Sequence, residues 1–193
     1  MNNEVLAYIN ERLDEAHNYI SSIFWVDGVL DYQYSNSDHD FIDHLNSMNP
    51  THTKIVLIHS HGGADGWWIW GSSFLQFKDG SKLYDNEVNR WLNYDGYFIF
   101  AGACDSATYD DLGNTFLNKG FDAYFGYTDS VYTVNNARFY SAFFDKGRHL
   151  DVTISEARDH AEQQVLSEFG SNSDVVKNKI IGDSSLCLAT SDW

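Results

Sequence analysis

Three apolar runs without polar alternation lie in the middle of the chain. They predict strands over residues 54–58, 97–101 and 123–127. Unbroken runs of this length are typical of strands that are covered on both faces. Segments with helical spacing lie between them and after them. The pattern therefore predicts an α/β fold in which helices cover both faces of a mostly parallel sheet.

At the start of the chain, apolar residues at helical spacing predict a helix over residues 4–17. A short apolar run over 23–26 ends at a turn signal and predicts a strand, which we expect to pair with residues 30–34 in a hairpin. Ser37 begins the next helix, which ends before Pro50.

The remaining predicted elements continue this order. They are a hairpin of residues 67–70 and 74–77, helices over 85–92, 111–118, 134–144 and 152–169, and a closing strand over 179–188. The sequence has neither repeats nor a linker, so we expect one domain over residues 1–193.

The composition limits the functions that the chain can have. Its 43% of hydrophobic and 16% of aromatic residues are typical of a folded protein. A formal net charge of −16 repels nucleic acid and acidic membranes, so we expect neither as a partner; it serves solubility or attracts basic substrates. Two cysteines are too few for a secreted disulfide scaffold and predict a reducing compartment, the cytoplasm.

Two predicted strands end in residues suited to nucleophilic catalysis. Strand 54–58 is followed by His61, and strand 97–101 is followed by Cys104. Ligands bind outside the carboxyl ends of strands in open α/β sheets, so the imidazole and the thiol face each other if these strands are neighbours. The thiolate is the reactive species, and a histidine within reach can take the thiol proton and return one to the leaving amine.

Other interpretations of these residues stay open. Cys104 could be an inert core residue, as we expect for Cys187. His59 and His61 lie on the same side of a strand and could bind a metal together with Cys104. A zinc site needs three or four ligands and no second cysteine lies nearby, so we expect neither a metal nor another cofactor.

Several motifs resemble those of clan CD cysteine peptidases, which include caspases, metacaspases, legumains, gingipains, clostripain and CHAT-domain proteases. Residues 55–63 resemble their histidine strand, which ends in a His-Gly pair. Residues 97–107 resemble the nucleophile strand. Residues 116–127 and 180–186 are similar to later segments of CHAT-domain and gingipain-like proteases.

The resemblance implies a caspase-like three-layer α-β-α sandwich with a mostly parallel central sheet. It also implies a cysteine endopeptidase, a hydrolase whose substrate is a protein or a peptide. In this mechanism Cys104 attacks the peptide carbonyl and His61 transfers the proton. The N–H groups of Gly62 and Cys104 hold the oxyanion.

The sequence departs from the family pattern at two places. Metacaspases carry an acid two residues before the cysteine, where this chain has Gly102. Substrate contacts are therefore expected from other residues, namely Asp27, Asp65, Trp67 and Asp105. The family also begins with a strand, whereas a helix is predicted over residues 4–17. These departures favour an alternative, a catalytically inactive caspase-like scaffold or regulatory domain. The sequence does not predict the oligomeric state.

Overall fold

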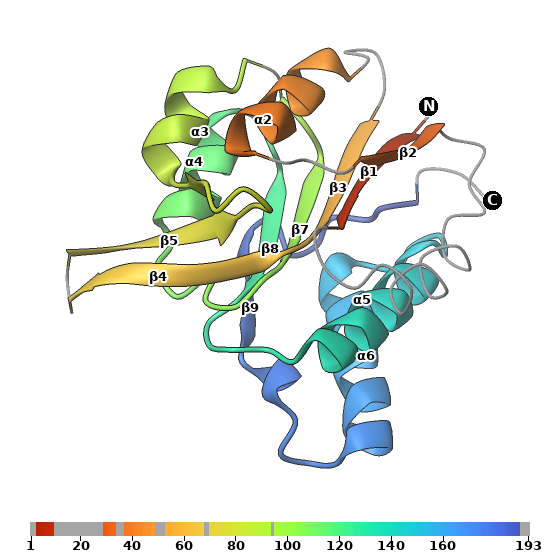
Figure 1. The fold of residues 1–193 in the computed structure, drawn as a ribbon. Coiled ribbons are helices and arrows are strands. Elements are labelled where there is room, and N and C mark those ends of the chain that lie inside the picture. Colours follow the sequence, from red (N-terminus) through yellow and green to blue (C-terminus); the bar gives the residue numbers. More distant parts are fainter. Residues whose placement is uncertain are drawn as a thin grey trace.

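The computed structural model describes residues 3–9, 29–33, 37–48, 53–67, 70–93 and 95–189. Its main element is a six-stranded sheet with strand order β2-β1-β3-β7-β8-β9 (Figure 1). The strands are β1 (Asn3–Ile9), β2 (Val29–Gln33), β3 (Thr53–His59), β7 (Phe98–Gly102), β8 (Ala123–Tyr127) and β9 (Asn178–Gly182). Neighbouring strands run parallel, apart from the antiparallel pair β8 and β9.

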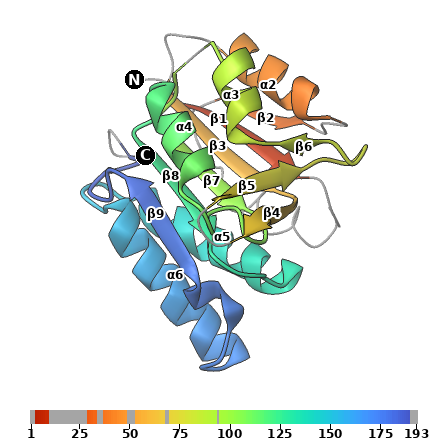
Figure 2. The same ribbon diagram turned by 90° about the vertical axis from the view of Figure 1, so that its left-hand side faces the viewer.

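Helices cover both faces of this sheet (Figures 1 and 2). One face carries α2 (Asp38–Ser47), α3 (Asp85–Trp91) and α4 (Asp111–Asn118), and the other carries α5 (Thr133–Gly147) and α6 (Ile154–Phe169). A smaller antiparallel sheet is formed by β4 (His61–Trp67), β5 (Trp70–Gln76) and β6 (Lys82–Leu83). The predicted three-layer sandwich with a mostly parallel sheet is therefore confirmed.

The central strands are apolar on both sides because each side faces a helix layer. Ile55 and Leu57 belong to the core cluster that contains residues of α5 and α6. Val56 and Ile58 belong to the cluster that contains residues of α2, α3 and α4. Successive side chains of a strand point to opposite faces, so one continuous apolar run fills both cores.

Aromatic rings make up much of the core between the sheet and α5. The rings of Phe100 and Phe125, on neighbouring strands, stack with centroids 4.3 Å apart. Phe98 stacks on Phe143 of α5 at 5.6 Å. Each such pair contributes about 0.5–1.5 kcal/mol beyond the burial of its area. These contacts fix α5 against β7, the strand that leads to Cys104.

The helix predicted over residues 4–17 is wrong in its described part, because residues 3–9 form β1. This strand lies between β2 and β3 and pairs with both of them in parallel. Two sheet neighbours outweigh the helical spacing, because strand preference depends strongly on context. The strand with which the family begins is therefore present.

The other predicted elements agree with the structure to different degrees. The strand over 30–34 is confirmed as β2, and its described neighbour is β1; the expected hairpin partner at 23–26 lies outside the described residues. A hairpin does follow the histidines, but its predicted bounds are wrong: the first strand, β4, begins at His61 and ends at Trp67, and Trp70 already begins β5. The closing strand is confined to β9, and beyond it an isolated bridge joins Thr153 to Cys187.

The predicted helices after residue 36 are present, and their caps explain where two of them begin. Ser37 accepts a hydrogen bond from the Asp40 N–H at 3.1 Å and so caps α2, as predicted. Thr153 and Glu156 form a capping box at the start of α6. Among the helices within the described ranges, none has the combined length and apolar character needed to cross a membrane.

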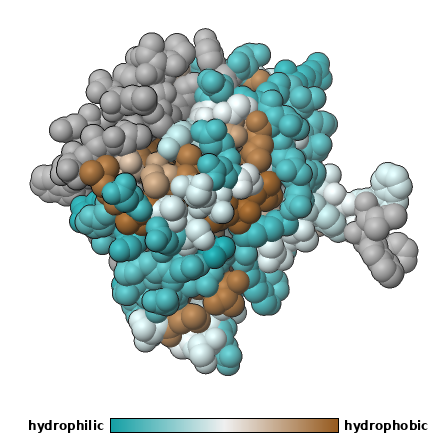
Figure 3. Space-filling view, turned by 180° about the vertical axis from the view of Figure 1, so that it is seen from behind, coloured by the Kyte–Doolittle hydropathy of each residue, from teal (hydrophilic) through white to brown (hydrophobic). Residues whose placement is uncertain are grey.

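Polar residues dominate the face that is seen from behind in Figure 3, and apolar residues appear there in separate areas. A strongly polar surface is expected for a chain with a formal net charge of −16. The extent of the domain, residues 1–193, stays a prediction.

Candidate active site

The ends of β3 and β7 bring the two predicted catalytic residues to one edge of the sheet. The strands are direct parallel neighbours, and His59 pairs with Gly102 at the end of their register. His61 and Cys104 each lie two residues beyond this pair. The expectation that the two strands are neighbours is therefore confirmed.

Gly62 packs β4 closely against the turn that carries Cys104. A methyl group on its Cα would lie 2.5 Å from the carbonyl oxygen of Cys104 and 2.8 Å from the Cβ of Ala103. It would also lie 3.0 Å from the carbonyl oxygen of Phe74 in β5. Two of these three atoms belong to backbone, so only glycine allows β4 to come this close to the nucleophile turn.

The variant Gly62→Ala is expected to lower stability by about 1–3 kcal/mol, because the added methyl forces backbone to move. We also expect peptide cleavage to fall by more than about tenfold, since β4 and Cys104 would be pushed apart. Thermal unfolding and kcat/KM measure the two effects. Gly147→Ala is the control, because its methyl meets only side chains, the nearest being Leu188 at 3.3 Å. Equal effects of the two variants would contradict the steric argument.

The thiol of Cys104 is partly exposed and contacts the loop after β8. Val131 donates its N–H to Sγ at 3.4 Å, and its carbonyl oxygen lies 3.6 Å from Sγ as a possible acceptor for the S–H. The thiol is therefore neither sealed in the core nor without polar neighbours.

The backbone N–H of Cys104 differs from those around it. The N–H groups of Ala103, Asp105, Ser106 and Ala107 all donate to backbone carbonyls. That of Cys104 has no acceptor within the described part of the chain. An unused donor beside a thiol is the arrangement that an oxyanion requires.

A tight turn directly follows the nucleophile. Asp105 adopts a φ of 54°, in the left-handed region that residues other than glycine seldom occupy. Its carboxylate accepts from the Thr108 hydroxyl at 3.0 Å. The fully buried Ser106 donates its hydroxyl to the Ala101 carbonyl at 2.9 Å and accepts from the Tyr127 N–H at 3.1 Å. These bonds hold the turn against β7 and β8.

The segment 173–177 holds the loop that contacts the thiol. Lys177 pairs with the Asp129 carboxylate at 2.5 Å, and its carbonyl accepts from the Thr128 N–H at 2.8 Å. The carboxylate of Asp174 accepts from the N–H of Tyr132. Val131 lies between these anchored positions, so its backbone is held where it contacts the sulfur of Cys104.

The two histidines of the motif have different environments. His61 is exposed, whereas His59 is 3% exposed and packs edge-on against Tyr140 with ring centroids 5.6 Å apart. Burial, together with the nearby His61, lowers the pKa of His59 to about 4. His59 is therefore neutral at pH 7. Within the described residues, no three His, Cys, Asp or Glu side chains form a group that could hold a metal ion.

Because the pKa of His59 lies below its usual 6.5, the unfolded chain binds the proton more readily than the folded one. The free energy of unfolding is therefore expected to fall as pH drops from about 6.5 to about 4, by about 3 kcal/mol from this group. Unfolding of the wild type and of His59→Gln, measured by denaturant titration across this range, tests the effect. The variant should lose less stability on acidification, and parallel curves would contradict the prediction.

Asn136 of α5 is the site residue that sequence reasoning missed. Its amide nitrogen donates to the Gly102 carbonyl at 2.9 Å and lies 3.4 Å from Nδ1 of His59. Because the Gly102 carbonyl can only accept a hydrogen bond, the side-chain amide of Asn136 must point its nitrogen, and not its oxygen, toward Gly102 and His59. No sequence signal marks Asn136, because it lies inside a helix far from both motifs.

The residues predicted to contact substrate lie at different places. Asp65 lies two positions after Gly63 and four after His61 in β4, on the same side of the strand as both. Its carboxylate accepts from Tyr84 at 2.5 Å and from Lys82 at 3.0 Å, which lowers its pKa. The backbone of Trp67 ends β4, and Asp27 lies outside the described residues.

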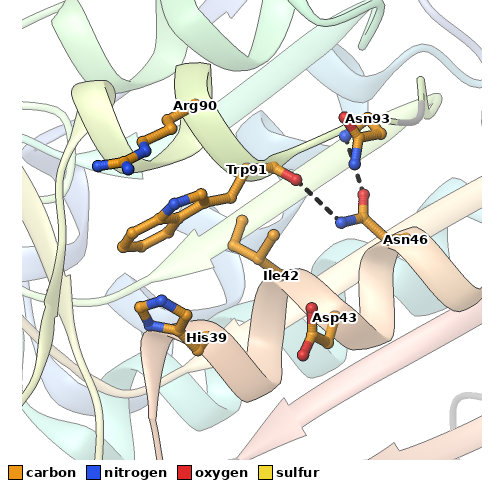
Figure 4. Close-up of a pocket in the computed structure, with 7 residues that line it drawn as sticks. All are labelled: His39, Ile42, Asp43, Asn46, Arg90, Trp91 and Asn93. Atoms are coloured by element: carbon orange, nitrogen blue, oxygen red, sulfur yellow. Dashed lines mark hydrogen bonds between the residues drawn. The ribbon is translucent and has the colours of Figure 1, made fainter.

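A pocket of about 270 Å³ lies between α2 and α3 (Figure 4). The ring of Trp91 lies between the side chains of His39 and Arg90, with the His39 ring centroid 3.9 Å away. At its other end, Asn46 donates to the Trp91 carbonyl and accepts from the Asn93 N–H, both at 2.9 Å. None of the predicted catalytic residues lines this pocket.

The fold is similar to those of two kinds of solved protease. Gingipain R, described as an Arg-specific cysteine proteinase, matches with a TM-score of 0.67 and 14% identity over 95% of this chain and 47% of its own. The complex of Porphyromonas gingivalis RgpB pro- and mature domains matches with a TM-score of 0.69 and 13% identity, over 95% and 48%. The Saccharomyces cerevisiae separase–securin complex matches with a TM-score of 0.61 and 12% identity, over 94% and 12%.

The chain thus spans about half the length of the gingipain chains. These structures have the caspase-like fold, which confirms the predicted clan CD resemblance and fold. The narrower likeness to CHAT-domain proteases stays a prediction. The model of the family described as "Peptidase family C25", to which gingipains belong and whose members are cysteine peptidases, matches residues 3–189. The chain therefore belongs to peptidase family C25.

Proposed function

We propose that the protein is a cysteine endopeptidase in which Cys104 is the nucleophile and His61 transfers the proton. The observation that carries the proposal is the packing of Gly62, the residue after His61, directly on the backbone of Cys104. Family membership and the gingipain-like fold support the same chemistry.

The reaction would proceed in two stages. The Cys104 sulfur attacks the carbonyl carbon of the scissile bond after His61 accepts the thiol proton, and the carbonyl oxygen becomes an oxyanion. His61 then returns a proton to the leaving amine, and a thioester links the acyl part of the substrate to Cys104. Water, deprotonated by His61, hydrolyses the thioester and restores the thiol.

The oxyanion would be bound by backbone donors. The N–H of Cys104 has no acceptor among the described residues, which makes it available for the developing negative charge. The N–H of Gly62 is the second proposed donor, since this residue lies against the same turn. Fixed donors of this kind stabilise a transition state more than the neutral substrate.

A protein or peptide is the proposed substrate, and its contacts would include the outer face of β4. This face carries His61 and Asp65, while Lys82 covers the ring of Phe74 at 3.9 Å. Asp65 is bonded to Lys82 and Tyr84, so we propose that it shapes this surface together with them rather than pairing alone with a basic side chain. Asp27, Trp67 and Asp105 stay proposed contacts.

The proposal is tested with a panel of fluorogenic peptides that differ in the residue before the scissile bond. Acyloxymethylketone peptides of the same sequences should label the active thiol. We expect cleavage of at least one peptide and labelling of Cys104, identified by mass spectrometry. A protein that cleaves none of them and whose Cys104 reacts no faster than a free cysteine would be an inactive scaffold instead.

We further propose that the protein works in a reducing compartment, the cytoplasm. Both cysteines are free thiols, and the mechanism requires one of them reduced. The formal net charge of −16 gives no support for a nucleic-acid or acidic-membrane partner. Detection of the protein in fractionated source cells tests this, and recovery from the extracellular fraction would contradict it.

A further inference from the structure

We propose that Asn136 is a positioning residue that holds the ends of β3 and β7 together and so sets the separation of His61 and Cys104. The inference rests on the proposed function, because it concerns the geometry of that catalytic pair. Asn136 lies in the first turn of α5, on the opposite side of the sheet from β4. It would therefore act on the site from beneath the sheet, without touching the substrate.

The contacts of Asn136 join both strand ends through one amide group. Its nitrogen donates to the carbonyl of Gly102, the last residue of β7, at 2.9 Å. The same nitrogen lies 3.4 Å from Nδ1 of His59, the last residue of β3. His59 and Gly102 are paired in the sheet register, so the amide bridges the final pair before the two motifs separate.

Glycine at position 102 is what allows this approach. A methyl group there would lie 2.8 Å from the amide nitrogen and 2.9 Å from the amide oxygen of Asn136. It would also lie 2.9 Å from the carbonyl oxygen of Ile58. At the position where metacaspases carry an acid, Gly102 leaves room for Asn136 of α5 to reach the strand end.

The burial of Asn136 is not explained by packing alone. The residue is 2% exposed, and its side-chain oxygen has no hydrogen-bond partner within the described residues. Burying an amide with one unsatisfied atom is unfavourable, and an apolar side chain would fill the same space without that cost. What the polar side chain provides is therefore the pair of hydrogen bonds from its amide nitrogen to Gly102 and His59.

The bridge matters for catalysis because of where it lies. His61 lies two positions after His59, and Cys104 lies two positions after Gly102. A change in the spacing of the strand ends is passed on to the imidazole and the sulfur. A displacement of about 1 Å from the reactive geometry can lower a rate by about a hundredfold.

The test compares Asn136→Ala with wild type in peptide cleavage. We expect kcat to fall by about 10- to 100-fold while KM changes less than about threefold, because the peptide-binding surface is untouched. Asn136→Asp keeps the shape of the side chain but replaces the donor, and is expected to lose a similar factor. If Asn136→Ala does not fold, this isosteric variant and its kcat decide the outcome.

Asn46→Ala is the matched control. Asn46 also uses its amide nitrogen to hold a backbone carbonyl of another element, Trp91 of α3, at 2.9 Å (Figure 4). Its loss should lower thermal stability without changing kcat. Equal kcat values for Asn136→Ala and wild type, or equal losses of kcat in the Asn136 and Asn46 variants, would overturn the proposal.

Two further measurements separate positioning from general destabilisation. The rate at which iodoacetamide alkylates Cys104 is measured against pH, and Asn136→Ala should shift this profile because the thiol no longer meets His61 at the native distance. The double variant His59→Phe with Asn136→Ala should be no slower than the slower single variant, since the two substitutions remove the same contact between Asn136 and His59. Independent losses that multiply would overturn the inference.

The proposed function and this inference can fail separately. If wild type cleaves no peptide and its Cys104 reacts like a free cysteine, the endopeptidase proposal and its positioning residue fail together. If wild type is active and Asn136→Ala is equally active with an unchanged alkylation profile, only the role of Asn136 is rejected.

Discussion

Replacement of Cys104 by alanine is expected to lower kcat/KM for peptide cleavage by at least about a thousandfold. Alanine removes the only group at this edge of the described sheet that can form the covalent thioester. The residual rate would come from the backbone donors and from substrate binding alone. Progress curves with the best peptide of the panel, at matched enzyme concentration, measure the loss. The unfolding temperature should stay within a few degrees of wild type, because the side chain is small and partly exposed.

Cys187→Ala is the matched control for this variant. Cys187 is also a free, partly exposed thiol, but its Sγ donates only to the carbonyl of Ser185, at 3.8 Å. Its replacement should leave kcat/KM unchanged within about twofold. If Cys104→Ala kept wild-type activity while Cys187→Ala lost it, the assignment of the nucleophile would be wrong.

Replacement of His61 by alanine is the second large effect that we expect. The loss in kcat should be about 10²- to 10⁴-fold, the range for removal of a positioned acid–base group. The reaction of Cys104 with iodoacetamide at neutral pH should also slow, because no imidazole takes up the thiol proton. KM should change little, since His61 acts on the proton rather than on the peptide chain.

His149→Ala serves as the control for the histidine. His149 is exposed and lies just after α5, away from β3 and β7. Its variant should match wild type in both kcat and alkylation rate. If His61→Ala slowed peptide cleavage but left alkylation of Cys104 unchanged, His61 would act only on the leaving group and not as the base for the thiol.

The centre of the fold could be predicted because strands that are buried on both faces have a recognisable sequence pattern. The runs that became β3, β7 and β8 are apolar without alternation, since their side chains enter two cores. Their helices followed from apolar spacing and caps. The placement of His61 and Cys104 just beyond two neighbouring strand ends then followed from the rule that parallel strands end at the same edge.

The beginning and the end of the sheet could not be predicted in the same way. Leu6 and Ile9 fit a helical pattern, and only their pairing with two neighbours makes residues 3–9 a strand. That pairing joins segments far apart in the sequence, and a short apolar segment fits either structure. The antiparallel direction of β9 depends on α6 and the segment after it, which no local signal specifies.

The supporting residues of the site were also beyond the reach of the sequence. Asn136 and Val131 contact the catalytic motifs only because α5 and its preceding loop fold under the ends of β3 and β7. Neither belongs to a motif, and an asparagine inside a helix is more commonly solvated. The sequence predicts which groups react, whereas the residues that support the strand ends depend on tertiary contacts.

A single residue, Ser60, separates β3 from β4, so the imidazole and the hairpin share one continuous ribbon of chain. Side chains alternate along such a ribbon, and His61 is outward because Gly62 is inward, against Cys104. Inserting or deleting one residue at position 60 would exchange these sides, turning the imidazole toward the protein and the glycine toward solvent. The length of this connection therefore decides which side of the ribbon carries the imidazole, as much as the presence of the histidine does.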